Sequence, residues 1–173
     1  MRAIRVHAYG DPPRIDDIAA PGAPGPGHLG IDVAAGGVGS WDVGVADGRL
    51  ARFVELQLPF VMGAELVGRV AAVGAGVEAF TVGDRVIANP GIVGAWAERV
   101  NLRASICGPA PVTLDDAQAA ALPVGAVTAL QALEMRGLPQ GSSLLIRGAG
   151  GSGGGAAIEL ARVRGLTVSA LLP

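Results

Sequence analysis

The sequence predicts an α/β protein in which an irregular, mostly β unit is followed by a partial βαβ unit. The chain has 173 residues, with 28 Gly and 12 Pro, and short apolar runs separated by Gly- and Pro-rich turns fill it up to residue 110. Residues 144–172 then read as strand, Gly-rich turn, helix and strand, the span that one βαβ unit needs. We therefore predict two domains, 1–110 and 111–173.

Alternating apolar residues predict the strands of the first domain. The opening strand and its hairpin partner are followed by a loop rich in Pro and Gly at residues 21–27. Ser40 is expected to cap a short helix. Asp84 and Arg85 follow a Gly in a turn, and we expect them to stabilise that turn and to form a local ion pair. The predicted strands are 3–8, 15–19, 28–35, 65–73, 85–88 and 95–101, and the helix is 41–46.

The character of the chain changes after Pro111, where helical patterns replace strands. An Ala-rich helix is expected over residues 115–121, with Thr113 as its N-cap. Pro123 opens a second helix over residues 124–136, which Gly137 and Pro139 end. The transition between the domains is expected within residues 109–123.

The Gly-rich turn between the last two predicted strands is the strongest functional signal. Six of the eight residues 148–155 are Gly, and an apolar-periodic helix over residues 156–163 follows them. Backbone without a Cβ can approach a pyrophosphate closely, and a helix N-terminus offers it free N–H groups and a positive dipole. The context therefore predicts a dinucleotide-binding turn. A flexible Gly-rich linker is the alternative.

Competing registers fit this fingerprint. The literal G-x-G-x-x-G match uses Gly148, Gly150 and Gly153, whereas counting back from the helix favours Ala149, Gly151 and Gly154. The predicted cofactor-binding residues of the turn are Ala149, Gly150, Gly151, Ser152, Gly153 and Gly154.

Composition excludes several classes of protein. The chain is 50% hydrophobic and 16% charged, so we expect a substantial core rather than disorder. Its formal net charge is −2, its basic residues are not clustered and its aromatic content is 3%, which argues against nucleic acid as a partner. No apolar run approaches membrane-spanning length, and we expect no membrane association. Cys107 is the single cysteine, so internal disulfides are excluded and a reducing cytoplasm is the simplest setting.

Several short motifs occur in a familiar order along the chain. Gly-Ala-Glu-Leu-Val-Gly at 63–68 is followed by Val-Gly-Asp-Arg-Val at 82–86, Ala-Ala-Ala-Leu-Pro at 119–123, Thr-Ala at 128–129 and the Gly-rich βαβ unit. Together they resemble the medium-chain dehydrogenase/reductase superfamily, in particular its zinc-free quinone oxidoreductase branch. The resemblance implies a GroES-like irregular β-barrel unit before a partial Rossmann unit, NADPH as cofactor, and hydride transfer to a quinone or an enone C=C.

The resemblance also implies that no zinc is bound. Zinc-dependent relatives have a His where this chain has Ala64 and a Cys where it has Gly39, although the following Glu65 remains. We expect His7 and His28 to have structural or surface roles rather than to bind metal.

Candidates near the nicotinamide also come from the resemblance, and no catalytic residue is identified. The loop containing Ser40 and Trp41 is implied to lie beside the nicotinamide, and Thr128 matches a Thr that contacts it. Thr128 could instead bond its own helix backbone. Many zinc-free relatives have Asn and Tyr where this chain has Gly39 and Gly44. Trp41 and Trp96 would wall an apolar pocket or pack in the core.

The sequence supplies two strands of a sheet that has six in a complete dinucleotide domain. A parallel sheet of two strands leaves its edges and one face open. We therefore expect residues 144–172 to be marginally packed, to self-associate as a homo-oligomer, to pair with a complementing C-terminal half, or to belong to a truncated product. Three functions remain: the N-terminal part of an NADPH-dependent oxidoreductase, a non-catalytic remnant that binds a small hydrophobic ligand, and an assembly partner.

Overall fold

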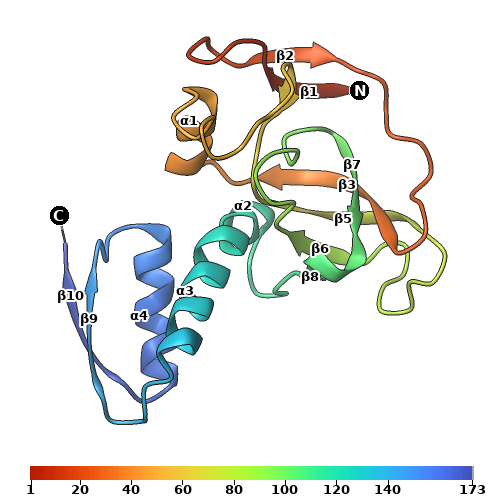
Figure 1. Ribbon diagram of the computed structural model, residues 1–173. Coiled ribbons are helices and arrows are strands. Elements are labelled where there is room, and N and C mark those ends of the chain that lie inside the picture. The colour runs from red at the N-terminus through yellow and green to blue at the C-terminus, as the bar shows by residue number, and fades with distance from the viewer. Residues whose placement is uncertain (173) are drawn as a thin grey trace. The chain divides into compact units, whose positions relative to one another are not determined.

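The computed structural model describes residues 1–172, and the chain forms two compact units that divide between Ala121 and Leu122. Figure 1 shows the elements of each unit. The first unit contains β1 (Arg2–Val6), β2 (Arg14–Asp17), β3 (His28–Gly36), α1 (Ser40–Ala46), β4 (Phe60–Val61), β5 (Leu66–Val73), β6 (Arg85–Ala88), β7 (Arg99–Arg103), a 3-10 turn (Ala104–Ile106), β8 (Cys107–Pro109) and α2 (Asp116–Ala120). The second contains α3 (Leu122–Arg136), β9 (Ser143–Arg147), α4 (Ser152–Val163) and β10 (Thr167–Leu171).

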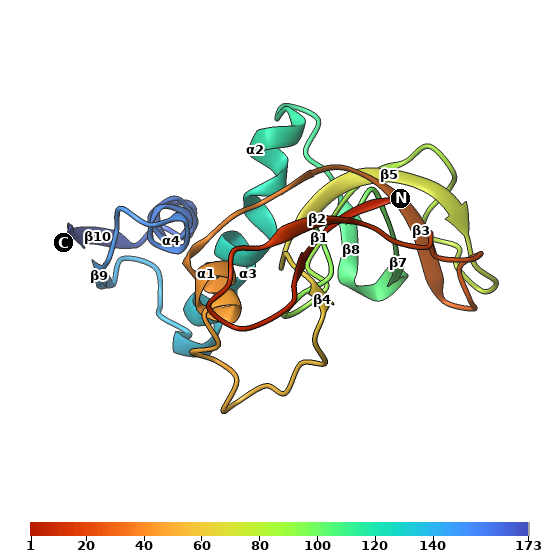
Figure 2. The ribbon, with the colours of Figure 1, turned by 90° about the horizontal axis from the view of Figure 1, so that it is seen from above.

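A curled antiparallel sheet of five strands, in the order β7-β3-β5-β6-β8, forms the frame of the first unit. Figure 2 shows how strongly β5 bends along its length. Pairing between β3 and β5 shifts register between Gly30 and Ile31 and again between Val33 and Ala35, and such bulges bend and twist a strand. The curl encloses one apolar cluster, whose buried members are Ala3, Leu29, Ile31, Leu66, Val70, Val86, Ala88, Ala95, Ala97 and Val100.

A smaller sheet, β2-β1-β4, is tied to the segment that leads into β7. The Ile4 N–H donates to the Trp96 carbonyl at 2.9 Å, and the Glu98 N–H donates to the Arg2 carbonyl at 3.1 Å. The N-terminal strand is thereby held by a segment that follows it by more than ninety residues. The predicted strand 95–101 is correspondingly divided: regular pairing with β3 begins only at Arg99.

Helix α2 packs with the first unit, where Ala119 and Ala120 lie in one apolar cluster with Val67 and Ala110. Its N-cap is Asp115, whose side chain accepts a hydrogen bond from the Gln118 N–H at 2.8 Å, so the prediction of Thr113 as N-cap was wrong. The acceptor must lie directly before the first helical residue to reach this N–H. The compact units divide after α2, whereas the domains predicted from sequence, 1–110 and 111–173, place α2 with the second part of the chain.

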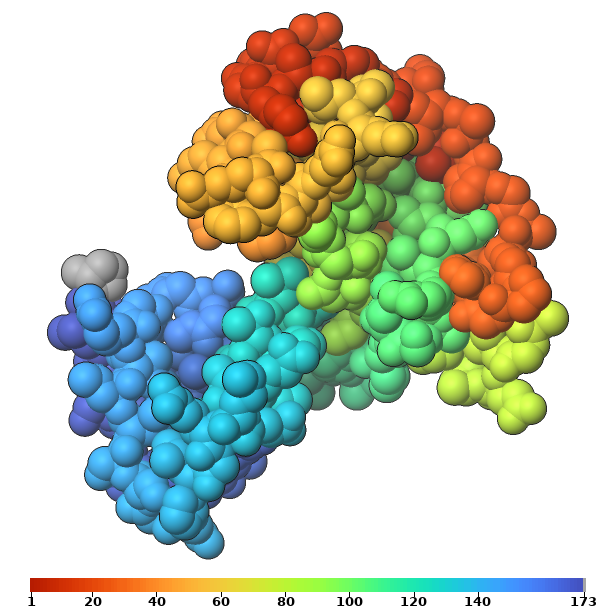
Figure 3. Space-filling model, viewed as in Figure 1, coloured from red at the N-terminus to blue at the C-terminus, as the bar shows by residue number. Residues whose placement is uncertain are grey.

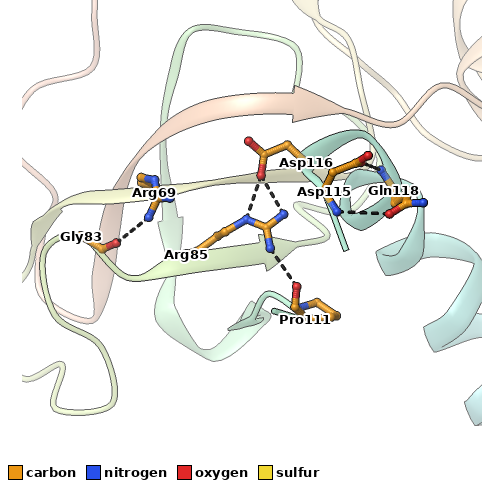
Figure 4. Close-up of polar contacts among 7 residues, drawn as sticks. All are labelled: Arg69, Gly83, Arg85, Pro111, Asp115, Asp116 and Gln118. Carbon is orange, nitrogen blue, oxygen red and sulfur yellow. Dashed lines mark hydrogen bonds and ion pairs between the residues drawn. The ribbon is translucent and has the colours of Figure 1, made fainter. Parts of the chain in front are cut away.

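Arg85 is anchored to the start of α2 rather than to its neighbour Asp84 (Figure 4). Its guanidinium lies 2.7 Å from the Asp116 carboxylate and donates to the Pro111 carbonyl at 2.8 Å. Asp84 instead accepts from the Thr81 N–H at 2.7 Å and closes the turn before β6. The predicted Asp84–Arg85 ion pair was therefore wrong, because consecutive residues of an extended chain point their side chains to opposite faces.

The second unit is a βαβ arrangement with α3 packed on its helix. Strands β9 and β10 pair in parallel from Ser143–Thr167 to Arg147–Leu171, as predicted. The buried core of this unit consists of Leu133 from α3, Ala161 from α4 and Leu166, which directly precedes β10. The opposite face of the two strands is bare, since Leu145 is 64% exposed and Leu171 is 51% exposed. Figure 3 shows these strands at the surface of the unit.

The starts of α1 and α4 differ from the sequence prediction in an informative way. Helix α1 begins at Ser40 itself and its N-cap is Gly39, so Ser40 does not cap it. Helix α4 begins at Ser152 rather than at residue 156, because the glycines of residues 153–155 are part of the helix and not of the turn. Gly is accepted at an N-cap such as Gly39, whereas the glycines of α4 take helical positions against their low helix propensity.

Candidate functional site

The Gly-rich turn of the second unit joins β9 to α4 and is fixed to the end of β10. Gly148 has φ +72°, a conformation that favours Gly. The N–H groups of Gly148 and Ala149 donate to the Leu171 carbonyl at 3.1 and 3.3 Å. The Gly151 N–H then donates to the Gly148 carbonyl at 3.2 Å and closes a tight turn directly before the helix. The turn is ordered by these bonds, which a flexible linker lacks.

Space around the glycines distinguishes the competing registers of the fingerprint. A Cβ at Gly154 would overlap the Gly148 carbonyl oxygen and would lie 2.7 Å from the Ala149 Cα. A Cβ at Gly153 would meet only the Gly125 carbonyl oxygen at an ordinary 3.9 Å. The third Gly of the fingerprint serves close packing of helix on turn, which is the environment of Gly154.

The start of α4 presents backbone donors without intrahelical acceptors. The first bond of the helix runs from the Gly155 N–H to the Gly151 carbonyl at 2.9 Å. The N–H groups of Ser152, Gly153 and Gly154 precede this bond, and Gly151 has no side chain to cap them. Together with the positive end of the helix dipole, these groups can bind a phosphate.

Helix α3 crosses close to the start of α4 in the second unit. A Cβ at Gly125 would lie 3.2 Å from the Ser152 hydroxyl oxygen, so the two helices approach at a glycine. Thr128 lies on the same helix and is exposed, and its hydroxyl makes no hydrogen bond within residues 1–172. The alternative in which Thr128 bonds its own backbone is therefore not what the structure contains.

In the first unit, three side chains hold the loop between β3 and α1. The Trp96 indole N–H donates to the Gly37 carbonyl at 3.0 Å. A Cβ at Gly36 would lie 2.7 Å from the Trp96 ring, and one at Gly37 would overlap the buried Glu65 carboxylate. Asp42 Oδ2 accepts from the Gly39 N–H at 2.8 Å. The loop that carries Ser40 and Trp41 is thus rigidly positioned.

Asp42 is buried, at 4% exposure, and uses only one of its carboxylate oxygens. Its Oδ1 has no hydrogen-bond partner among the described residues. Ser40 and Trp41 precede it and are exposed, and the Trp41 indole N–H donates to the Ile92 carbonyl at 3.3 Å. Nothing in the sequence pattern marked Asp42 as a buried carboxylate, since a helix of seven residues is too short to define a polar face.

An open groove of about 380 Å³ lies on the first unit beside this loop. Trp96 is part of its wall and Trp41 is not, so this groove is not lined by both tryptophans. Val38 and Ile15 lie on its rim at 75% and 71% exposure. Arg2 and Glu98, paired at 2.7 Å, supply the charged part of the lining.

Ala64, at one of the positions where the sequence resemblance implies a metal ligand in zinc-dependent relatives, is buried, and the other such position is Gly39. Within residues 1–172, no three His, Cys, Asp or Glu side chains gather as a metal site. His7 Nε2 lies 2.8 Å from Asp16, and His28 Nδ1 lies 2.8 Å from the Pro26 carbonyl, so both histidines bond locally.

The thiol of Cys107 is partly buried, and this burial raises its pKa to about 11. Its Sγ lies 3.4 Å from the Arg103 carbonyl, so Cys107 is a packing residue rather than a reactive thiol.

No helix in residues 1–172 combines the length and apolar character that crossing a membrane requires.

Comparisons with known proteins agree with this arrangement. The model of the alcohol dehydrogenase GroES-like domain matches residues 25–113. The quinone oxidoreductase of Rattus norvegicus is 36% identical over 172 residues, which are 97% of this chain and 51% of that protein. The chain therefore spans about half the length of the curated quinone oxidoreductases that it matches.

Solved structures show the same fold. An alcohol dehydrogenase superfamily protein from Novosphingobium aromaticivorans is 32% identical, with a TM-score of 0.93 over 100% of this chain and 53% of that one. The quinone oxidoreductase of Thermus thermophilus, whose structures include a complex with NADPH, is 32% identical, with a TM-score of 0.83 over 98% of this chain and 52% of that one.

These matches confirm the predicted fold class, an irregular GroES-like β unit followed by a partial Rossmann unit. The sequence resemblance is confirmed with it: the chain belongs to the alcohol dehydrogenase GroES-like family, within the medium-chain dehydrogenase/reductase superfamily.

Proposed function

We propose that the chain is part of a zinc-independent, NADPH-dependent oxidoreductase that reduces a quinone or an enone C=C. The observation that carries the proposal is the Gly-rich turn, where Gly154 packs on the Gly148 carbonyl and the first N–H groups of α4 are left free. Its relatives include quinone oxidoreductases, one of them solved with NADPH. Zinc independence is supported by Ala64 and Gly39, which offer no metal-binding atoms where zinc-dependent relatives have ligands.

The residues of the turn fit a dinucleotide. A Cβ is absent where the phosphates would approach, and Ser152, Gly153 and Gly154 would donate their N–H groups to the pyrophosphate. The cofactor, when bound, supplies the hydride, and a proton completes reduction of the acceptor. The chain contributes by binding and orientation, since no Ser-His-Asp or Cys-His set occurs in the sequence.

In the first unit, the rigid loop before α1 is proposed to contact an apolar substrate. Trp96 and Glu65 fix the backbone at Gly37, and Asp42 fixes it at Gly39. Ser40 and Trp41 are then presented on a loop that cannot easily move, which is what positioning an apolar substrate requires. Thr128 remains a proposed contact of the nicotinamide end.

Calorimetric titration of the 173-residue chain with NADPH, with NADH as the control, tests the proposal. Micromolar affinity, which is about −8 kcal/mol, is expected for the ordered turn. Quinones and enones are then assayed with and without a chelator, and unchanged turnover under chelation is expected. A folded chain that binds neither dinucleotide would remove the proposal. Turnover that disappears with the chelator would remove zinc independence alone.

The bare face of β9 and β10 favours a second function, that of an assembly partner or half of a split enzyme. Leu145 and Leu171 are both more than half exposed there, and parallel sheets are normally covered on both faces. Sedimentation equilibrium of the wild type and Leu145→Thr tests this function. Concentration-dependent association that the substitution weakens is expected, whereas a monomer at all concentrations would contradict homo-oligomer formation. The cytoplasm is the proposed location for either function.

A further inference from the structure

Arg147 is the last residue of β9 and directly precedes the Gly-rich turn. It is exposed, and within residues 1–172 its side chain has no ion pair and no hydrogen bond. Its neighbours Leu144 and Ile146 are half-buried on the helix side of the strands, and Arg147 lies on the opposite face with Leu145. Neither described strand of this sheet contains an acidic residue.

The other arginines of the second unit have electrostatic reasons for their places. Arg136 and Arg162 lie in the last turns of α3 and α4, where the helix dipole favours a cation. Arg164 lies 3.5 Å from Glu134. Arg147 is different, because it lies near the beginning of α4 rather than at its end.

The turn brings the backbone of Arg147 close to the positive end of the helix dipole. Gly148 and Gly151 are the ends of a turn, and their Cα atoms are at most about 7 Å apart. Adding one residue, the Arg147 Cα lies within about 11 Å of the Cα of Gly151, the N-cap of α4. A cation beside free N–H groups is unfavourable in the unliganded protein. It becomes favourable when an anion binds between them.

We propose that Arg147 is a cofactor-binding residue that contacts the pyrophosphate of the dinucleotide, and this inference rests on the proposed function. The N–H groups of α4 are neutral donors, whereas a pyrophosphate carries negative charge that needs a counter-charge. A guanidinium binds phosphate oxygens through two parallel hydrogen bonds, which a lysine cannot imitate. The second unit has four Arg and two Glu, and its excess of positive charge agrees with an anionic ligand.

The test compares Arg147→Gln with Arg162→Gln, a matched exposed arginine at the far end of α4. Both variants and the wild type are titrated calorimetrically with NADPH and with inorganic pyrophosphate at low and moderate salt. Arg147→Gln is expected to weaken NADPH binding roughly tenfold to a hundredfold and to reduce its salt dependence. Arg162→Gln is expected to change it less than about threefold. Arg147→Lys is expected to recover part of the affinity, because charge returns without the planar fork.

Thermal unfolding of the unliganded proteins gives an independent readout. Arg147→Gln is expected to leave the midpoint unchanged or to raise it, because a cation is removed from the positive end of α4. Arg162→Gln is expected to lower the midpoint slightly. A loss of NADPH binding in Arg147→Gln therefore cannot be attributed to unfolding.

The outcomes separate the inference from the function. If the wild type binds NADPH and Arg147→Gln binds it equally well, the inference is overturned and the proposed function stands. If pyrophosphate binds with the expected dependence on Arg147 but NADPH does not bind, the anion contact stands and the dinucleotide function is overturned. If the folded wild type binds neither, both are overturned.

Discussion

Gly154 lies so close to the Gly148 carbonyl oxygen that a side chain at residue 154 cannot be accommodated. Gly154→Ala is therefore expected to destabilise the protein by about 1–3 kcal/mol, because helix α4 must move away from the turn. NADPH binding should weaken as well, since the turn that presents the N–H groups is displaced. Urea unfolding and calorimetric titration measure the two effects.

The neighbouring glycines are matched controls for Gly154. A Cβ at Gly155 would meet nothing within 4 Å, so Gly155→Ala is expected to stabilise helix α4 by about 0.5–1 kcal/mol. Gly153→Ala is expected to be close to neutral. If Gly153→Ala were the damaging substitution instead, the literal register with Gly148, Gly150 and Gly153 would be the functional one.

Trp96 is expected to stabilise the loop before α1 through both its ring and its N–H. Trp96→Phe removes the hydrogen bond to the Gly37 carbonyl and should cost about 1–2 kcal/mol. Gly63→Ala should cost at least about 2 kcal/mol, because Gly63 has φ +94° and its Cβ would overlap the Trp96 ring. Trp41→Phe is the control, because the indole hydrogen bond of Trp41 is longer and exposed. Its free energy of unfolding is expected within about 0.5 kcal/mol of the wild-type value. Equal losses for both tryptophans would contradict the specific role of Trp96.

Arg85 is expected to be coupled energetically to Asp116 and not to Asp84. A double-mutant cycle with Arg85→Ala and Asp116→Ala should give a coupling of about 0.5–1 kcal/mol, modest because half of the Asp116 side chain is exposed. The cycle with Asp84→Ala should give a value near zero. Arg85→Ala alone should cost about 2 kcal/mol, since the bond to the Pro111 carbonyl is also lost. Coupling to Asp84 would mean that the local ion pair forms in solution.

Cys107 is expected to react slowly with a thiol reagent in the folded protein. Its pKa is raised from 9.0 to about 11, so at pH 8 the thiolate fraction should be roughly a hundredfold below that of the unfolded chain. The raised pKa contributes stability that is fully present below pH 9 and is lost as pH rises through about 11. Rates of alkylation with and without urea measure the difference. Equal rates would show that the thiol is exposed in solution.

The order of strands and helices was predictable because apolar periodicity and Gly or Pro breaks mark each element. The parallel pairing of residues 143–147 with 167–171 followed from the strand–helix–strand pattern. Helix starts were less predictable, since Ser40 and Thr113 are good capping residues but Gly39 and Asp115 take those positions. Propensity describes a residue alone, whereas the cap depends on where the preceding chain turns.

The candidate site was predicted only where its chemistry is local in sequence. The Gly-rich turn is one continuous stretch, so its residues could be named in advance. The bonds from Trp96 to Gly37 and from Arg85 to Asp116 join residues that are distant in sequence, and no periodic pattern contains that information. Arg147, which we propose as a pyrophosphate contact, was not among the predicted residues because a single arginine at a strand end has no distinguishing motif. Its place relative to the helix dipole is visible only in three dimensions.

The attachment of β1 to residues 96–98 bears on how the protein is made. Strand β1 is synthesised long before Trp96 and Glu98, the residues to which its backbone bonds in the folded unit. Until then Ala3 and Val6, which are buried in the folded unit, are exposed to solvent and to other nascent chains. Synthesis of the first unit therefore includes a long interval in which β1 lacks the residues that bury it, and slow translation would prolong this interval.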